Sequence, residues 1–245
     1  MYRCLFIFIL FSVFACKEKD TDTLTAQQIV DRSIEVCGGD RYDTSNITFD
    51  FRDKTYVLDV SDNNRTLKRI TKTDSSVVVD VRRGSDFERY VNDSLVVVHD
   101  TLASKYANSI NSVHYFAYLP FGLNDVAVNK KLLGEVNVRD QNYYKIEVTF
   151  DKDGGGKDFD DVYIYWFNTD TFKPDFLAYE FHVDGGGMRF REAVNERTLE
   201  GIRFVDYNNY KTKDQSTPIS KIDSLFQEEK LEFLSKIELR NITLE

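Results

Sequence analysis

The feature that most constrains the fold is a succession of short runs in which hydrophobic and polar residues alternate. Ile47, Phe49 and Phe51, for example, alternate with Thr48 and Asp50. A period of two is that of a β-strand with one buried face. Similar runs follow at residues 56–60, 67–70, 77–81, 87–91 and 95–98, and again at 131–138, 142–150, 162–168, 176–183, 188–198 and 202–211. Turn-forming residues separate the runs, as at 92–94, which predicts successive antiparallel strands.

A helix precedes these strands. Thr25 and Gln28 form a capping box, apolar residues then recur at helical spacing, and Gly38 stands where a helix C-cap favours positive φ. Cys37 falls on the apolar face of this helix. We therefore expect Cys37 to be a core residue rather than a reactive thiol.

Two other helices and a last strand complete the predicted set. Residues 101–118 lack Gly and Pro, carry apolar residues at helical spacing and end before Pro120. Pro218 opens a short helix, and residues 231–244 alternate again, which predicts a final edge strand. A long antiparallel sheet with one apolar face must close on itself or curl beneath covering helices. We expect a mainly β, α+β domain over residues 25–245, with a core supplied by its many Tyr and Phe residues.

The first fifteen residues are typical of a removable export signal. Arg3 supplies a positive charge, a short apolar stretch follows, and the small Ala15 precedes Cys16. This stretch is about half as long as the roughly 20 apolar residues of a spanning helix. The residues before Cys16 resemble a bacterial lipobox, in which the Cys is acylated and becomes the N-terminus. The alternative is an ordinary secretory signal with an incidental Cys.

Lipidation at Cys16 would add more than one acyl chain, which gives a stable membrane anchor. Residues 16–24 would then be a flexible, charged tether between lipid and domain. We expect a cell-envelope protein anchored to a membrane, with the outer membrane favoured over the inner. The formal net charge of −9 and the lack of a basic block argue against nucleic acid as a partner.

Several motifs resemble chemical sites but lack the features that such sites require. The segment 151–161 carries five Asp around three Gly, but it lacks EF-hand spacing and a closing Glu, so we interpret it as a solvated loop without a metal. The glycine run in 182–190 is not followed by a P-loop helix. No His pair has metal-ligand spacing and no Ser sits in a nucleophile elbow. We predict no cofactor, no metal site and no catalytic residue.

Aromatic residues cluster at the end of the 101–118 helix and on the later strands, where some of them can line a ligand slot. The predicted ligand-binding set is Tyr115, Phe116, Tyr118, Phe121, Trp166, Tyr179, Phe181, Met188 and Phe190, together with Arg189 and Arg191. The arginines fit a polar rim that holds a carboxylate or phosphate in a two-pronged grip. The alternatives are ordinary core packing for the aromatics and cross-strand ion pairs on a solvent face for the arginines.

Several longer stretches carry a family resemblance. They are FDFRDKTY, NSVHYFAYLPFGLND, DDVYIYWFNTDT, FLAYEFHVDGGGMRFREAVNER and GIRFVDYNNYK. With the lipobox, they resemble an uncharacterised family of Bacteroidota lipoproteins, which is similar in turn to the LolA/LolB-type outer-membrane lipoprotein carriers. The resemblance implies a half-barrel of about eleven antiparallel strands, whose concave face is lined by hydrophobic side chains and lidded by helices to form a slot for acyl chains.

Three functional hypotheses follow. The first is a lipid-anchored envelope lipoprotein that binds a hydrophobic or acylated ligand, such as an acyl chain or a lipoprotein, without catalysis. The second is an interaction or scaffold protein that uses the same sheet with a filled core. The third is an enzyme of unknown reaction. Because one fold hosts many activities, the architecture does not choose among them.

Overall fold

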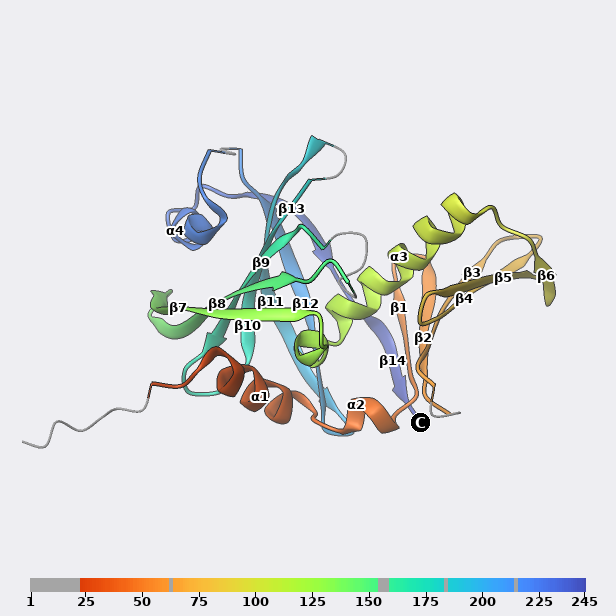
Figure 1. Ribbon diagram of the computed structural model, residues 1–245, viewed down its shortest axis with the longest axis horizontal. Helices are drawn as coiled ribbons and strands as arrows, with labels where there is room; N and C mark the ends of the chain where they lie inside the picture. Colours follow the sequence, from red (N-terminus) through yellow and green to blue (C-terminus); the bar gives the residue numbers. More distant parts are fainter. Residues whose placement is uncertain (1–22, 62–63, 154–158, 183–184, 214–215) are drawn as a thin grey trace, which may run out of the picture.

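The computed structural model describes residues 23–61, 64–153, 159–182, 185–213 and 216–245. The predicted export signal and Cys16 lie outside these ranges. The described strands form two seven-stranded antiparallel sheets (Figure 1). The first sheet has the order β14 (Arg240–Leu244), β1 (Ile47–Phe51), β2 (Lys54–Asp59), β3 (Thr66–Lys72), β4 (Val77–Arg83), β5 (Asp86–Val91) and β6 (Ser94–Val96). The second sheet has the order β13 (Glu232–Ile237), β12 (Ile202–Lys211), β11 (Gly187–Leu199), β10 (Pro174–Phe181), β9 (Val162–Asn168), β8 (Gln141–Phe150) and β7 (Val128–Val138).

The predicted fold class, mainly antiparallel β with a few covering helices, is confirmed. The described strands number fourteen rather than about eleven, and they hydrogen-bond into two sheets rather than one. Each sheet is chiefly a meander of consecutive strands, because short turns join most neighbours. The predicted hairpin at 92–94 is present, with positive φ at Asn92 and Asp93, as a tight β-turn of the primed type requires.

The last predicted strand, residues 231–244, is two strands that link the sheets. β13 pairs with β12, and β14 pairs with β1. The break falls at Leu239, whose N–H donates to Asp206 Oδ1 at 2.9 Å and whose carbonyl accepts from Arg197 Nη2 at 2.6 Å. Two side chains of the second sheet therefore take the hydrogen bonds that a continuing ladder would have made.

The first sheet is covered on one face by α3 (Asp100–Ala117), as predicted for residues 101–118. Beneath the C-terminal part of α3 lies a core that includes Phe49, Tyr56 and Leu58. Nearer the N-terminus of α3 the covered face is polar and contains the buried Arg69 and Asp80. Most residues of the outward face are half-buried or exposed, with Thr66 and Val81 as buried exceptions, so this sheet largely follows its period-two pattern.

The second sheet is buried on both faces, so the prediction of one apolar face is wrong for it. In β9, Tyr163, Tyr165 and Phe167 face the core beneath α1 (Ala26–Cys37) and the end of α3, while Ile164 and Trp166 pack toward α4 (Ile222–Gln227). The sequence of β9 is almost continuously apolar, which is the pattern of a strand covered on both sides.

Polar contacts begin α1 and dock α4. The α1 capping box at Thr25 and Gln28 is formed as predicted. On the other face, Asp223 of α4 accepts from Lys145 Nζ at 2.6 Å and from Trp166 Nε1 at 3.1 Å, in a buried pair that docks α4.

Cys37 is a buried free thiol, as predicted, and burial raises its pKa to about 11. Further short helices are α2 (Arg41–Thr44), η1 (Phe121–Asn124) and η3 (Ile219–Lys221).

Candidate functional site

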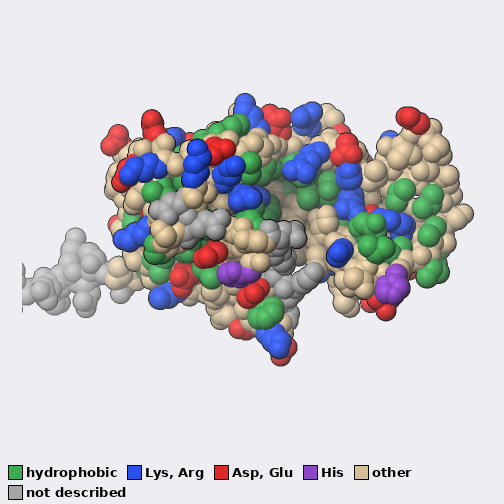
Figure 2. Space-filling view, turned by 90° about the horizontal axis from the view of Figure 1, so that it is seen from above, with side chains coloured by type: hydrophobic (Ala, Val, Ile, Leu, Met, Phe, Trp, Pro, Cys, Tyr) green, Lys and Arg blue, Asp and Glu red, His purple; other side chains and the backbone are tan. Residues whose placement is uncertain are grey.

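A cavity of about 430 Å³ lies where the two sheets meet beneath the C-terminal half of α3. The space-filling view shows a depression between the two lobes of the molecule (Figure 2). Its lining comes from α3, from β9 to β13, and from the β1–β2 turn: Phe51, Arg52, Ser112, Val113, Phe116, Ala117, Asp161, Tyr163, Tyr179, Phe181, Arg189, Arg191, Val205, Tyr207, Asn209, Ser235, Ile237 and Leu239. This volume is within the range, roughly 300–1,000 Å³, of small-molecule sites.

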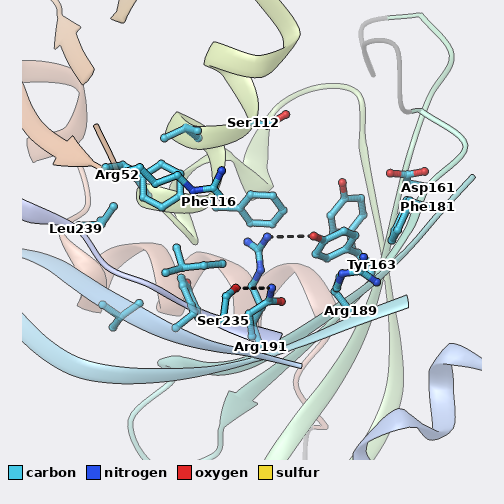
Figure 3. A pocket seen from close by; sticks show the side chains of 18 residues that line it. Arg52, Ser112, Phe116, Asp161, Tyr163, Phe181, Arg189, Arg191, Ser235 and Leu239 are labelled. Atoms are coloured by element: carbon cyan, nitrogen blue, oxygen red, sulfur yellow. Dashed lines mark hydrogen bonds between the residues drawn. The ribbon is translucent and has the colours of Figure 1, made fainter. Parts of the chain in front are cut away.

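Strand alternation selects which side chains of the second sheet reach the cavity. Tyr179 and Phe181 are two apart on β10, and Arg189 and Arg191 are two apart on β11, so all four share one face. Tyr179 is the direct cross-strand partner of Arg189, and Arg191 is that of Asn209 on β12. The site is therefore built on paired strands, with α3 above it (Figure 3).

Arg191 is the most unusual residue of the cavity. Only 8% of its surface is exposed, yet Arg191 makes no salt bridge within the described ranges. Its Nη2 donates to the Tyr179 hydroxyl at 3.0 Å, and the Phe116 ring lies 4.0 Å from its Cζ (Figure 3). Its Nε is buried and has no hydrogen-bond partner. An aromatic ring and a hydroxyl compensate only part of the cost of burying a guanidinium.

Asn209, across the strand pair from Arg191, is also incompletely bonded. It is 7% exposed, and its Nδ2 donates to Ser235 Oγ at 3.2 Å. Its Oδ1 is buried without a hydrogen-bond partner. Buried polar atoms in native proteins are nearly always hydrogen-bonded, so two unsatisfied atoms on neighbouring cavity residues mark a site that a ligand can complete.

The charge of the lining is positive. Arg189 lies beside the Phe181 ring, with 4.9 Å between Cζ and the ring centroid, and Arg52 lies beside the Phe51 ring at 5.1 Å. Three arginines therefore face one acidic lining residue, Asp161. Such a surface attracts anions. Burial also raises the pKa of Tyr207 to about 12, so its hydroxyl stays neutral and available for hydrogen bonds.

Of the predicted ligand-binding residues, the cavity brings together Phe116, Tyr179, Phe181, Arg189 and Arg191. Their role in binding remains a prediction. Arg197 and Arg203, from the same arginine-rich strand pair, instead form ion pairs with Asp206 and Glu196. Arg197 and Arg203 thus make cross-strand ion pairs, although Arg203 is buried rather than on a solvent face, whereas Arg189 and Arg191 line the cavity.

The other predicted residues lie elsewhere. Tyr115 hydrogen-bonds Tyr165 at 2.7 Å in the adjoining core, while Tyr118 contacts His114 at 3.2 Å beneath the first sheet. Phe121 lies under Arg65, 4.4 Å from its Cζ to the ring centroid. The remaining three, Trp166, Met188 and Phe190, pack on the α4 face of the second sheet, away from the cavity. Along their strands these three residues alternate with residues that line the cavity. Successive side chains of a strand point to opposite faces of the sheet, so these three point away from the cavity.

Several lining residues are not among those predicted from the sequence. Val205, Tyr207 and Asn209 alternate on β12, and pairing that strand with β11 would have placed Asn209 opposite Arg191. Phe51 and Arg52 come from the first sheet, and no local pattern indicates that a turn of one sheet reaches a cavity of the other.

Other chemistry receives little support from the described residues. Within the described ranges, no three His, Cys, Asp or Glu side chains form a group suited to a metal ion. In the acidic segment, Asp151 accepts from Asn129 Nδ2 at 2.8 Å, and residues 154–158 lie outside the description. No helix in the described part of the chain is long and apolar enough to cross a membrane.

Comparison with solved structures finds similar overall folds at low identity. A LolA superfamily protein from Nitrosomonas europaea aligns over 91% of this chain and 94% of its own, with 14% identity and a TM-score of 0.48. A DUF1329 family protein from Desulfovibrio piger aligns over the same shares, with 14% identity and a TM-score of 0.41. A candidate outer membrane lipoprotein-sorting protein domain from Vibrio parahaemolyticus aligns over 88% and 93%, with 6% identity and a TM-score of 0.41.

All three TM-scores are below 0.5. A search of curated proteins found no significant match. A family model does match, over residues 3–239, and the chain therefore belongs to the family of unknown function DUF6503.

Proposed function

We propose that this protein binds an amphiphilic anion in the cavity between its sheets, without catalysing a reaction. The observation that carries the proposal is Arg191, a buried cation with a free Nε and no salt-bridge partner among the described residues. A buried charge is costly unless it is paired. A carboxylate or phosphate that enters the cavity supplies the missing partner, through a charge-assisted hydrogen bond.

The rest of the cavity suits the apolar part of such a ligand. Phe116, Phe181, Val205 and Ile237 present hydrocarbon to the same space that Arg191 enters. Each methylene buried there contributes about 0.8 kcal/mol. An acyl chain would pack against these side chains, and its acid group would pair with Arg191.

We also propose that the domain is held at a membrane of the cell envelope by lipid on Cys16. The apolar-to-charged change at Cys16 and the small Ala15 before it support this proposal. Cys16→Ser should release the protein from the membrane fraction or leave the signal uncut, and globomycin should block processing of the wild type. Unchanged size and fractionation in both experiments would exclude lipidation.

Ligand binding is tested by titration of a fluorescent fatty acid into delipidated protein. We expect saturable uptake by the wild type, and Arg191→Met should bind the anionic probe about tenfold more weakly, which is the loss of one modest charge-assisted bond. Arg83→Met, which changes an exposed arginine far from the cavity lining, is the matched control and should bind normally.

The same experiment separates the carrier from a scaffold. If no acyl probe is taken up saturably and no lipid copurifies with the protein from its native host, the interaction or scaffold protein is favoured instead.

A further inference from the structure

We infer that the anionic head group of the ligand carries its own hydrogen-bond donor beside the charge. This inference rests on the proposed function and concerns the same cavity. Arg191 and Asn209 are direct cross-strand partners on β11 and β12, so their side chains leave the sheet on one face, with Cβ atoms about 4.5–5.5 Å apart. Both are at least nine-tenths buried, and each has one unsatisfied atom.

The two unsatisfied atoms are of opposite kinds. Arg191 Nε–H is a donor and calls for an acceptor, which a carboxylate or phosphate oxygen supplies. Asn209 Oδ1 is an acceptor and calls for a donor. A plain carboxylate has acceptors only, so it would satisfy Arg191 and leave Asn209 Oδ1 buried and unpaired, with negative oxygen close to it.

In the structure the Asn209 amide is oriented so that its oxygen is the free end. The Asn209 Nδ2 is engaged by Ser235 Oγ at 3.2 Å, and Ser235 is the cross-strand partner of Asn209 on β13. Arg191 is held in the same way, by the Tyr179 hydroxyl at Nη2 and the Phe116 ring over its guanidinium (Figure 3). Both side chains are therefore preorganised, and a ligand does not pay to order them.

The chemistry that matches this pair is an acid with a hydroxyl or an amide N–H close to the charge. A hydroxy fatty acid and an N-acyl amino acid both have it, whereas a simple fatty acid does not. Failure to pair a buried polar group in a site built for it rejects a ligand more strongly than a lost methylene does. We expect donor-bearing acids to bind about tenfold more tightly than their donor-free analogues.

Two matched ligand pairs test this directly by displacement of a fluorescent fatty acid from the full chain, freed of copurifying lipid. One pair is 3-hydroxymyristate and 3-methoxymyristate, and the other is N-myristoylglycine and N-myristoylsarcosine. Each pair differs only in the donor hydrogen, which is replaced by a methyl group, and plain myristate serves as the common reference. We expect the donor-bearing member of at least one pair to bind about tenfold more tightly than both its analogue and myristate.

Asn209→Leu should abolish that preference while myristate still binds. The matched control is Asn208→Leu, because Asn208 is the next residue on β12, faces the other side and donates to Glu192 at 3.1 Å. Asn208→Leu should keep the preference. Equal binding of all acids to the wild type, or a preference that persists in Asn209→Leu, would overturn the inference and leave the proposed function standing. If neither the fluorescent fatty acid nor any of the acids binds, the proposed function itself fails.

Discussion

Helix α3 covers two buried arginines that differ in how they are satisfied. Arg69, under the middle of the helix, is 7% exposed, and Arg191, under its C-terminal part, is 8% exposed. Arg69 donates from Nε and Nη2 to Asp80 and from Nη1 to Ser109 of α3. Asp80 also accepts from Arg89, at 2.6 Å. Arg191 has a tyrosine hydroxyl, an aromatic ring and a free Nε.

The difference separates an arginine that holds the fold together from one that is open to a ligand. Beneath the middle of α3, one carboxylate pairs with two guanidiniums, and Nε, Nη1 and Nη2 of Arg69 each donate a hydrogen bond. Beneath the C-terminal part of α3 lies the Arg191 guanidinium, whose Nε has no hydrogen-bond partner. A buried polar group left unsatisfied is costly, so its presence in a cavity points to an external partner.

The largest expected effect comes from breaking the ion network around Asp80. Asp80→Ala leaves Arg69 and Arg89 without a carboxylate, and removal of one partner from a buried ion network costs about 3–5 kcal/mol of unfolding free energy. Urea denaturation measures this loss. The control is Asp59→Ala, which breaks the more exposed Lys68 pair and should cost less than about 1 kcal/mol. A loss at Asp80 as small as the control would mean that the network contributes no stability.

A second test uses His114, which lies on α3 between the two arginine sites. It is buried, and the lack of water around the imidazolium lowers its pKa from 6.5 to about 3. The pKa of His114 is lower in the folded protein than in the unfolded chain. The unfolding free energy is therefore undiminished above pH 6.5, and it decreases as the pH falls toward 3, because only the unfolded chain takes up the proton. At pH 5 the loss is about 2 kcal/mol, from about 1.4 kcal/mol for each pH unit.

The acid sensitivity of His114 is measured against His114→Gln, in which the titrating group is absent. The difference in unfolding free energy between the wild type and this variant should shrink as the pH falls from 6.5 to 4. A difference that is constant with pH would show that His114 titrates normally in the folded protein.

A third test converts the open arginine into a closed one. Phe116→Asp places a carboxylate where the ring now lies 4.0 Å from Arg191 Cζ, so Arg191 gains an internal partner. We expect the affinity for an anionic acyl probe to fall about tenfold, while a neutral acyl probe is affected less. Phe116→Leu is the control. It should lose only the cation–π interaction between the Phe116 ring and Arg191, which contributes about 1 kcal/mol. Equal weakening of anionic and neutral probes by Phe116→Asp would argue against an anion site at Arg191.

The smallest expected effect is on stability at the open site. Arg191→Met replaces the guanidinium by an apolar side chain of similar length and leaves no carboxylate unpaired among the described residues. The unfolding free energy should therefore change by less than about 1 kcal/mol in either direction. Thermal and urea denaturation check this value. A loss of the size expected for Asp80→Ala would show that Arg191, like Arg69, is a structural residue.

Much of the architecture can be read from local patterns. The strands predicted at 162–168 and 202–211 are β9 and β12 themselves, and the helix predicted at 101–118 is α3 within one residue at each end. The Thr25 capping box forms as expected. These features depend on residues close together in the chain, where hydrogen-bonding side chains and the period of apolar residues act directly on the backbone.

Long-range contacts decided what the local patterns left open. The break in the last strand depends on Asp206 and Arg197 capturing the backbone of Leu239, and the double burial of the second sheet depends on where α4 docks. The sequence indicated which residue types a ligand site would use, and it placed Arg191 and Phe116 among them. Only the tertiary structure determined that Arg69 pairs with Asp80 and that Arg191 lies beside Asn209. Strand pairing and helix packing decide which buried charges have partners within the chain.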